Sequence, residues 1–565
     1  MSVQKTLEVV FLWHMHQPDY RDPETGTYAL PWVYLHALKD YTDMAAHLER
    51  HPRIRAVVNF VPVLLEQLED YCRQFATGAF RDPLLRLLGH EDFGALAPQE
   101  RALVLERCFR ANPATMIEPF PHYRRLHDLY GCVEGEGPIA LGYLSGAMLA
   151  DLVTWYHLAW TGETERRNRP LLAELFGKGD GYSLRDRLRL RELIGEVLRA
   201  IVPRYRALAE RGQIELSSTP SSHPLAPLLI DFGCAREPDV EAVLPAAAGY
   251  PGGRERVRSQ LAHAIAYHKD RFGSAPAGIW PAEGAVSTAF VELLAEAGCR
   301  WAASSSAVLG NSLNHRDPGM ARVSGNLYFG YRLEGAAGPA LFFRDEYLSD
   351  LIGFEYAKWH GRDAASHFVD RLDEIRAQIP EGETRLVSVI LDGENAWEQY
   401  AYNAYYFFED LYAELEARAG IRTATFAGYL AEHEGDLRPL PRLVAGTWVY
   451  GNFSTWIGSA DKNRAWDLLC AAKAACDRAL ASQTLSAAER ARAQQILSVC
   501  ESSDWFWWFG DYNPALAVAS FDALFRANLR ALYRVLDIAA PEALAEPISR
   551  GGGSPEIGGA MRRAH

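Results

Sequence analysis

Short apolar runs recur along the chain, and segments with the residue spacing of amphipathic helices lie between most of them. The runs are almost uniformly apolar, which is typical of parallel strands covered on both faces. This order predicts a parallel sheet with helices outside it. Because polar groups cluster after the strands, we favour a closed barrel over an open sheet. The predicted strands are residues 7–13, 54–60, 214–219, 277–281, 300–304, 340–344, 386–391 and 423–426.

Two regions depart from this alternation. Residues 81–211 have a helical pattern and are too long for one connection, which indicates a helical insertion. After Gly446 an aromatic loop leads into a second helical region, and the glycine-rich end of the chain can bury little side-chain surface. We therefore expect a barrel with its insertion over residues 1–445, a C-terminal helical domain over residues 446–548 and a disordered tail over residues 549–565.

Composition and charge exclude several classes of protein. The 565 residues are 48% hydrophobic and 23% charged, as in globular proteins, and the net charge of −14 disfavours broad binding to nucleic acids. We find no signal peptide and no apolar stretch of the ~20 residues that a membrane helix needs. The eight cysteines form no CxxC pair, so a zinc ribbon or a dense disulfide framework is not expected. These features predict a cytoplasmic protein without membrane or nucleic-acid partners.

The first candidate for chemistry is the pair His14 and His16 at the end of the first predicted strand. Alternate side chains of a strand share a face, and Pro18 ends the strand just beyond them. Two imidazoles placed in this way can bind a metal, transfer protons or hydrogen-bond a polyhydroxylated ligand. The alternative is that one histidine is hydrogen-bonded in the core and the other is exposed.

Two carboxylate-bearing segments follow two further strands. Glu283 stands where the strand at 277–281 ends, between the small residues Ala282 and Gly284 and close to Trp280. Catalytic groups of barrel enzymes occupy this kind of position. The structural alternative is a carboxylate that only favours the start of the next helix through the helix dipole.

Asp392 directly follows the apolar strand at 386–391, and Glu394, Asn395 and Trp397 come next. A carboxylate in this position is costly to desolvate unless it has a partner or lies in a cleft. The cluster therefore favours a site over a turn. The alternative is a solvated loop in which Asp392 caps the next helix.

Aromatic residues form a third group. The segments 446–458 (GTWVYGNFSTWIG) and 502–510 (SSDWFWWFG) set their rings among Gly, Ser, Thr, Asn and Asp rather than among aliphatic residues. Indole planes with carboxylates or amides beside them suit the apolar faces and hydroxyl edges of sugars. Packing between the barrel and the C-terminal helices is the alternative for about half of these rings. The pattern does not decide between Trp507 and Trp508.

Together, two carboxylates, two histidines and many indoles indicate glycoside chemistry. In such reactions one carboxylate attacks or stabilises the anomeric carbon while the other protonates the leaving oxygen. Only the fold can bring Glu283 and Asp392 together, since they lie far apart in the sequence.

Several ordered blocks of the chain, spread over residues ~5–510, resemble glycoside hydrolase family 57, in particular its branch of amylopullulanases and related α-glucan enzymes. The blocks are 14–18 (HMHQP), 212–216 (GQIEL) with 221–224 (SSHP), 280–284 (WPAEG), 391–395 (LDGEN), 446–458 and 503–508 (SDWFWW). The resemblance implies a seven-stranded, incomplete (β/α) barrel followed by a helical domain. It also implies α-1,4- or α-1,6-glucan substrates and a retaining mechanism.

The resemblance further assigns residues to roles. It implies Glu283 as the nucleophile and Asp392 as the general acid/base, whose pKa we expect to be raised by Trp280, Trp397 and the charge of Glu283. The remaining residues that we expect to bind substrate are His14, His16, His223, Trp280, Glu394, Trp397, Trp448, Asp504 and Trp505, with Arg344 and Asp345 as weaker candidates.

We expect no cofactor and no metal, and an α-glucan as the binding partner. Three alternatives remain open. A glucan transferase or branching enzyme would use the same residues with a sugar hydroxyl as the acceptor. A metal-dependent polysaccharide deacetylase would use His14, His16 and a carboxylate as ligands. A non-catalytic glucan-binding protein would not require the pair of acids.

Overall fold

Seven parallel strands close into a barrel. The structure is a computed structural model and describes residues 5–133, 135, 142–314, 320–335, 338–482 and 485–553. Around the barrel β1 is followed by β2, β3, β4, β5, β7 and β8, and β8 pairs with β1 again. The pairing between β7 and β8 is short, with Arg344 opposite Ser388. The strands are β1 Thr6–Met15, β2 Ala56–Phe60, β3 Ile214–Ser218, β4 Gly278–Ile279, β5 Trp301–Ser305, β7 Ala340–Arg344 and β8 Thr384–Asp392. The expected (β/α)7-type barrel is confirmed.

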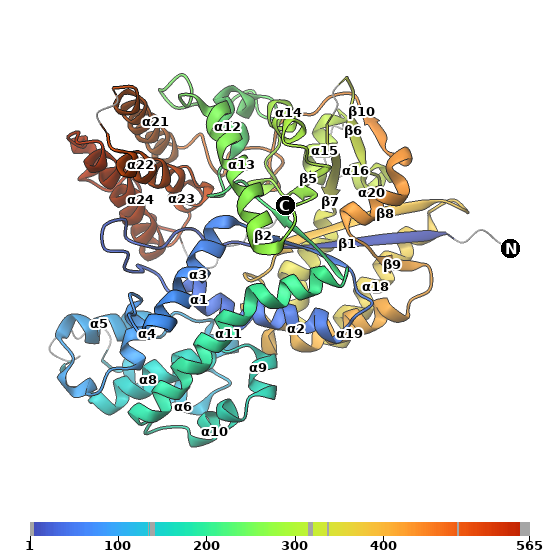
Figure 1. Ribbon diagram of the computed structural model, residues 1–565. Helices are drawn as coiled ribbons and strands as arrows, with labels where there is room; N and C mark the ends of the chain where they lie inside the picture. The colour runs from blue at the N-terminus through green and yellow to red at the C-terminus, as the bar shows by residue number, and fades with distance from the viewer. Residues whose placement is uncertain are drawn as a thin grey trace.

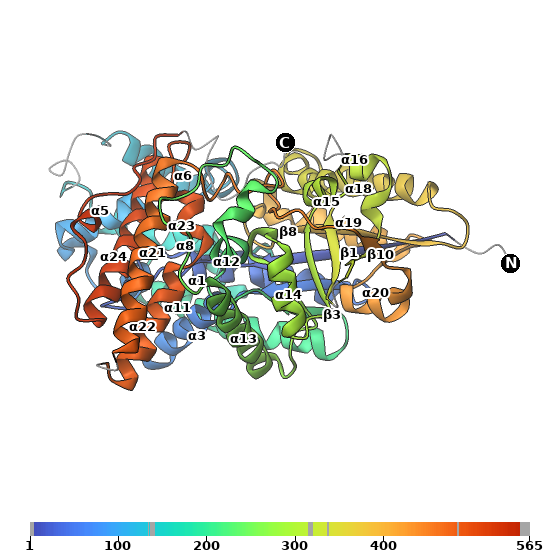
Figure 2. The same cartoon turned by 90° about the horizontal axis from the view of Figure 1, so that it is seen from above.

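Helices surround the barrel and extend from it in two groups (Figures 1 and 2). The first group, between β2 and β3, comprises α4 Pro83–Leu88, α5 Pro98–Arg107, α6 Pro121–Gly131, α8 Gly146–Ala159, α9 Glu163–Asn168, α10 Pro170–Lys178 and α11 Leu184–Glu210. The second group follows the barrel and comprises α21 Ala460–Ala481, α22 Ala487–Cys500, α23 Ser503–Trp508 and α24 Ala515–Val535. Other helices that bear on the barrel are α1 Trp32–His36, α2 Thr42–Arg50, α3 Pro62–Thr77, α12 Ala226–Ile230, α13 Gly253–Phe272, α14 Thr288–Glu296, α15 Ser306–Ser312, α16 Met320–Val323, α17 Glu346–Asp350, α18 Gly361–Ala377, α19 Tyr405–Ala417 and α20 Phe426–His433.

The predicted strand at 423–426 is only partly a strand. β9 (Ile421–Thr423) pairs with the N-terminal end of β1, and Phe426 begins helix α20 because the Thr425 hydroxyl caps it. Phe426 closes the bottom of the barrel, where its ring stacks on Phe342 with 4.5 Å between centroids. The two other short strands, β6 (Tyr331–Leu333) and β10 (Arg438–Leu440), extend the sheet beside β7.

The alternation of β1 places its histidine at the inner edge of the barrel. Val10 and Leu12 belong to the apolar cluster inside the barrel, whereas Trp13 and Met15 pack with the surrounding helices. His14 therefore continues the inward-facing row. In the register of the sheet, His14 is opposite Asn59 of β2 and Asp392 of β8, so three polar side chains meet at the C-terminal end of the barrel.

The division into domains stays a prediction, although its segments can be located. Ser549, which we expected at the start of a disordered tail, is buried and accepts a hydrogen bond from the amide of Gly510, and the amides of Gly552 and Gly553 bond to the Asn513 carbonyl. The rest of the predicted tail, 554–565, lies outside the described residues. Within the described part of the chain, no helix is both long enough and apolar enough to cross a membrane.

The closure of the barrel depends on glycine at position 278. A Cβ atom on Gly278 would lie 2.1 Å from the indole of Trp301, which the Glu215 carboxylate holds at 2.6 Å. We expect Gly278→Ala to reduce the free energy of unfolding by about 1–3 kcal/mol, the usual cost of overpacking, as measured by urea or thermal denaturation. Gly435→Ala is the matched control, because a Cβ there meets no atom within 4 Å. Equal stability of the two variants would contradict this account.

Candidate active site

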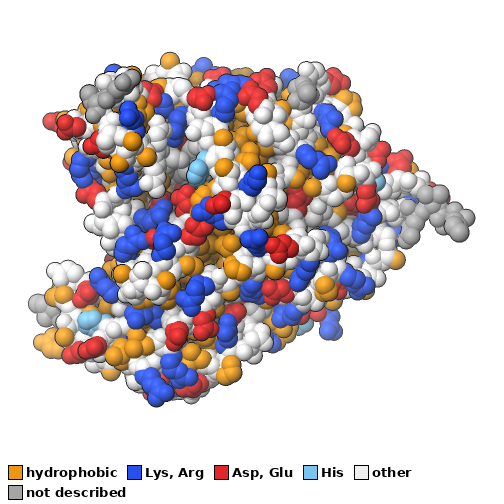
Figure 3. All heavy atoms as spheres, in the orientation of Figure 1, with side chains coloured by type: hydrophobic (Ala, Val, Ile, Leu, Met, Phe, Trp, Pro, Cys, Tyr) orange, Lys and Arg blue, Asp and Glu red, His pale blue; other side chains and the backbone are white. Residues whose placement is uncertain are grey.

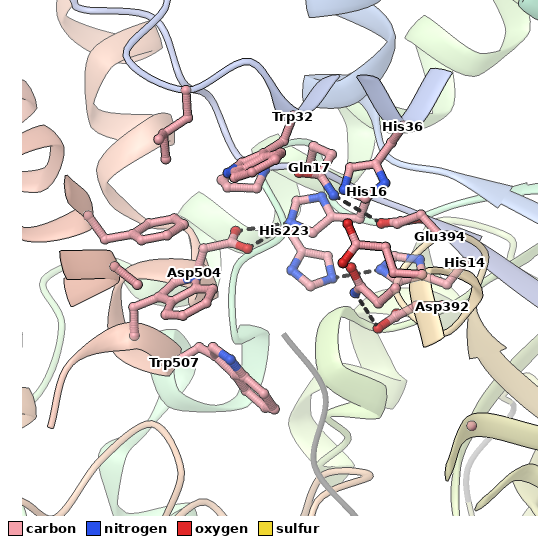
Figure 4. A pocket seen from close by; sticks show the side chains of 18 of the residues that line it. His14, His16, Gln17, Trp32, His36, His223, Asp392, Glu394, Asp504 and Trp507 are labelled. Atoms are coloured by element: carbon pink, nitrogen blue, oxygen red, sulfur yellow. Dashed lines mark hydrogen bonds and ion pairs between the residues drawn. The ribbon is translucent and has the colours of Figure 1, made fainter. Parts of the chain in front are cut away.

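A cavity of about 700 Å³ lies at the C-terminal ends of the barrel strands. Its wall combines loops that follow β1, β3, β4 and β8 with residues of α23 and α24, so barrel and C-terminal helices face each other across it (Figure 4). In Figure 3 acidic and basic side chains are interspersed on the visible face of the molecule. The sequence-predicted residues on this wall are His14, His16, His223, Glu283, Asp392, Glu394, Trp448 and Asp504.

Glu283 is held by a strained turn and by two hydrogen-bond donors. The chain leaves β4 through Pro281, and Glu283 adopts left-handed backbone angles (φ 58°, ψ 23°), which is rare for a residue with a Cβ atom. Its carboxylate accepts a hydrogen bond from Trp448 Nε1 at 2.9 Å and one from Ser503 Oγ at 3.0 Å. The backbone amide of Trp448 donates to the carbonyl of Glu283 at 2.9 Å, which fixes the aromatic loop on the turn.

Asp392 is the last residue of β8. The amide of Gly393 donates to the carbonyl of His14 at 2.7 Å, so the loop after β8 is tied to the end of β1. The side-chain amide of Asn395 donates to Asp392 Oδ2 at 2.9 Å. Glu283 and Asp392 thus reach the same cavity from two separate strands.

Burial raises the pKa of both acids. The pKa of Glu283 rises to about 8, first because the side chain is desolvated and then because Asp504 and Asp392 place negative charge beside it. The pKa of Asp392 rises to about 6, mainly through desolvation. The upward direction for Asp392 agrees with expectation. However, desolvation rather than the charge of Glu283 is the main cause of the raised pKa of Asp392. Glu283 has the higher pKa of the two acids and so holds its proton more tightly than Asp392 does.

Three histidines form a stacked group beside Glu283, with His223 Nδ1 3.9 Å from Glu283 Oε1. The rings of His16 and His223 stack with 3.8 Å between centroids, and His14 Nε2 lies 3.1 Å from His223 Nε2. His16 Nε2 donates to the Asp504 carboxylate at 2.9 Å, which connects β1 to α23 (Figure 4). Burial lowers the pKa of His14 to about 3 and that of His223 well below its usual range, so both rings are neutral.

Glu394 is a buried acid on the cavity wall. Burial and the nearby charge of Asp392 raise the pKa of Glu394 well above its usual range. Gln17 Nε2 donates to Glu394 Oε1 at 3.2 Å. The second carboxyl oxygen has no hydrogen-bond partner among the described residues.

Three of the predicted indoles lie in the core rather than on the cavity wall. Trp280 is fully buried beneath the site and meets Trp448 edge to face, with 5.3 Å between centroids. Trp397 donates to the carbonyl of Gly393, and Trp505 donates to the carbonyl of Val499. These rings support the wall from behind, and for Trp505 this is the packing alternative that the sequence left open.

Arg344 and Asp345 also lie behind the wall. Arg344 donates to the carbonyl of Ile390, and its guanidinium lies 5.7 Å from the ring centroid of Trp448. Its positive charge lowers the pKa of Asp392 and so opposes the effect of burial. Asp345 caps α17 and pairs with Arg322 at 3.2 Å, which is a structural role.

Trp507 and Trp508, for which the sequence left the choice open, both line the cavity, where Trp32 and Phe521 complete an aromatic part of its wall. The sequence did not single out Trp32 or Phe521. Trp32 and Phe521 lie in ordinary helical patterns that carry no signal. Two hydrogen-bonding residues had a weak signal: Asn59 is a polar residue within the apolar run of β2, and Ser503 precedes Asp504 in the aromatic block.

His16, His223 and Asp504 are the group at this site whose spacing would suit a metal, since their ligand atoms lie within 4.8 Å of one another. Both ring nitrogens of His223 already face His14 and Ser503, and His16 Nε2 faces Asp504. A metal would have to replace these hydrogen bonds, and we therefore assign none of the three as a ligand. His14, a ligand in the deacetylase alternative, is not in the group.

Comparison with known proteins places the chain in a family context. The sequence model of glycosyl hydrolase family 57 matches residues 10–438. The fold is similar to a family 57-type branching enzyme of Pyrococcus horikoshii (16% identity, TM-score 0.57, covering 98% of this chain and 99% of that chain). It is also similar to the α-amylase AmyC of Thermotoga maritima (12% identity, TM-score 0.55, 95% and 93% covered) and a 4-α-glucanotransferase of Thermococcus litoralis (13%, 0.52, 94% and 60%). No curated protein sequence matches the chain.

The raised pKa of Glu283 predicts a pH-dependent stability. Between its usual pKa of 4.5 and about 8, the folded protein binds more protons at Glu283 than the unfolded chain, so folding stability falls as pH rises through this window. Glu283→Gln removes this dependence. We expect its free energy of unfolding to gain a few kcal/mol on that of the wild type between pH 5 and 9, at about 1.4 kcal/mol per pKa unit, with the melting temperature at each pH as the readout.

Asp392→Asn is the matched control. Its stability relative to the wild type should also increase with pH, but the increase should end near pH 6, where the pKa of Asp392 lies. If the melting temperatures of the wild type and Glu283→Gln differ by a constant amount from pH 5 to pH 9, Glu283 does not have a raised pKa.

Proposed function

The chain belongs to glycosyl hydrolase family 57, and from this premise we propose that it cleaves α-1,4- and α-1,6-glucans with retention of configuration, as amylases and amylopullulanases do. The observation that carries the proposal is that Glu283 and Asp392 share one cavity with three histidines and an aromatic wall. A retaining glycosidase requires two such acids, one to attack and one to transfer protons.

In the proposed cycle, the Glu283 carboxylate attacks the anomeric carbon while Asp392 donates its proton to the departing glycosidic oxygen. This step forms a glycosyl ester on Glu283, breaks the carbon–oxygen bond and leaves Asp392 ionised. Asp392 then takes a proton from the acceptor hydroxyl, whose oxygen displaces Glu283 and restores both acids. Asp392 thus acts first as an acid and then as a base.

The pKa order of the free enzyme requires a transfer of charge when substrate binds. With pKa values of about 8 for Glu283 and about 6 for Asp392, the pair holds one proton near pH 7, mostly on Glu283. The reactive form has the same total charge but carries the proton on Asp392. Positive charge that develops at the anomeric carbon favours ionised Glu283, so the transition state stabilises the reactive arrangement.

The remaining wall residues suit a sugar. Trp448 presents a partly exposed ring beside Glu283. Indoles bind the C–H faces of sugars, so this ring suits a sugar at the site. The similar structures carry the names branching enzyme, α-amylase and 4-α-glucanotransferase, which agrees with a glucan as the substrate.

Transfer to a second glucan is the other candidate function, and the aromatic wall favours it. Trp508 stacks on Phe521 with 4.6 Å between centroids, and both line the cavity from the C-terminal helices. A ring pair in this position can hold an acceptor sugar in place of water. The same glycosyl ester on Glu283 serves hydrolysis and transfer, so the acceptor alone distinguishes them.

The two acids can be distinguished by azide rescue. With an α-maltosyl fluoride donor, which needs no acid for departure, Glu283→Ala should lose nearly all activity and form a β-glycosyl azide when azide is added. Asp392→Ala should instead form an α-glycosyl azide, because azide then attacks the ester on Glu283. NMR of the azide products gives the anomer. The same anomer from both variants would show that the roles are wrongly assigned.

The products from maltoheptaose and pullulan test hydrolysis against transfer. Shortened chains alone mean hydrolysis, whereas longer or branched chains mean transfer. If the aromatic wall holds the acceptor, Trp508→Ala should reduce the ratio of transfer to hydrolysis at least several-fold, as measured by chromatography. Trp359→Ala is the matched control, because this indole is 45% exposed and lies outside the cavity wall. An unchanged ratio in Trp508→Ala would exclude this role of the wall.

A further inference from the structure

An unbroken series of hydrogen bonds connects Glu283 to the end of β2. Glu283 Oε1 lies 3.0 Å from Ser503 Oγ, which lies 2.8 Å from His223 Nδ1. His223 Nε2 lies 3.1 Å from His14 Nε2, and His14 Nδ1 lies 2.7 Å from the Asn59 side-chain amide. All five side chains are buried. Five elements of the fold contribute to the series: β1, β2, the loop after β3, the turn after β4 and α23.

The hydrogens in this series can point in only two ways. A neutral imidazole carries one hydrogen, so one ring nitrogen donates and the other accepts, and a serine hydroxyl also has one hydrogen. His14 and His223 are neutral because burial lowers their pKa. Each link needs one hydrogen, and therefore the direction of one link fixes the direction of all the others.

Trp448 determines which carboxyl oxygen of Glu283 can carry a proton. Its indole nitrogen can only donate, and it faces Glu283 Oε2 at 2.9 Å. When Glu283 is neutral, its proton must therefore lie on Oε1 and point to Ser503. When Glu283 is ionised, Oε1 accepts the hydrogen of Ser503, and His223 then carries its hydrogen on Nδ1.

At the His14 end of the series, the side-chain amide of Asn59 is compatible with both directions of the hydrogen bonds. Turning its side-chain amide by 180° exchanges the oxygen and the nitrogen that face His14 Nδ1. The neighbours allow both orientations. The hydroxyl of Ser217 lies 3.0 Å from the Asn59 amide and can donate or accept. The hydroxyl of Thr219 lies 3.1 Å from the amide and accepts from it when its own hydrogen goes to the carbonyl of Trp280 at 2.8 Å.

We propose that Ser503, His223, His14 and Asn59 form a hydrogen-bond relay whose direction reverses with the charge of Glu283. The relay offers the Ser503 hydroxyl to the carboxylate only in the ionised state, which is the state that attacks the sugar. These four are positioning residues for Glu283. Their catalytic importance depends on the proposed function, whereas the reversal itself does not.

The reversal balances in protons. In the neutral state the hydrogens run from Glu283 to Ser503, from Ser503 to His223, from His223 Nε2 to His14, and from His14 Nδ1 to the oxygen of Asn59. Ionisation removes one proton from the network. Each remaining hydrogen then belongs to the other partner of its link, and the Asn59 amide group donates to His14 Nδ1.

Histidine tautomers measured by ¹⁵N NMR test the relay directly, because protonated and unprotonated ring nitrogens have very different shifts. In the full-length protein with ¹⁵N-labelled histidine, His223 should change from Nε2–H to Nδ1–H, and His14 from Nδ1–H to Nε2–H. Both changes should share one midpoint near pH 8, where Glu283 ionises. Resonances are assigned by single histidine replacements.

Glu283→Gln sharpens this test. Because Trp448 can only donate, the amide oxygen of the new side chain must face it, and the amide hydrogens then point to Ser503. Both histidines should therefore stay in the tautomers of the neutral state at every pH. A tautomer change that persists in Glu283→Gln, or tautomers that stay constant in the wild type across pH 6–10, would overturn the relay.

The relay predicts that Ser503→Ala changes both kcat/KM at neutral pH and the position of its alkaline limb. Charged or titratable groups around Glu283 are Asp392 on β8, Asp504 on α23, His14 on β1, His16 just after β1, His223 after β3 and Arg344 on β7. Loss of the hydroxyl leaves these groups in place but raises the pKa of Glu283. We expect kcat/KM on maltoheptaose to fall about tenfold at neutral pH and its alkaline limb to rise by about one pH unit.

Ser221→Ala is the matched control, since its hydroxyl bonds to Gln260 and His263, outside the relay. A loss of activity in Ser503→Ala without a shift of the alkaline limb would show a structural role only. Failure of the relay is distinguishable from failure of the proposed function. If the tautomers do not reverse but Glu283→Gln is inactive on glucans, the relay is wrong. If they reverse and Glu283→Gln stays active, the nucleophile is wrong.

Discussion

The contact between the start of α23 and the ends of the barrel strands is the interaction on which the site depends. Ser503 is hydrogen-bonded to Glu283 and Asp504 accepts from His16, while the backbone amide of Ser503 donates to the carbonyl of His223. Without this contact the barrel would carry two acids and three histidines on an open edge. With it, the side chains are desolvated and their pKa values move far from ordinary values.

This burial is costly, and the fold offsets the cost with hydrogen bonds and backbone strain held in place by packing. Glu283 and His223 both have positive φ angles, 58° and 63°, in a region that residues with a Cβ atom seldom occupy. Both positions are secured by neighbouring segments. Trp448 bonds to the carbonyl of Glu283, and Ser503 bonds to that of His223. Strain that is retained at two facing residues of one cavity is typical of sites where geometry serves function.

The pKa order of the two acids shows how environment assigns chemistry to similar groups. Glu283 receives two hydrogen-bond donors, which favour its ionised form, yet desolvation and two neighbouring carboxylates outweigh them. Asp392 has the charges of His16 and Arg344 near it, which limit its rise. A pair that shares one proton at neutral pH therefore results from the surroundings of both acids, and a bound sugar with developing positive charge can reverse which of them holds it.

The sequence by itself determined the seven barrel strands and the positions of both acids, because each strand is a local apolar run and each acid lies at or just beyond the end of one. The inward direction of His14 likewise follows from local alternation. Only the tertiary structure decided which indoles reach the cavity: Trp505 and Trp508 are three residues apart, yet one lies in the core and the other on the wall. It also decided the partners of Glu283 and His14, since Ser503 and Asn59 come from distant elements. Local periodicity fixes which face a side chain takes, but contacts across hundreds of residues depend on how strands and helices close around a shared space.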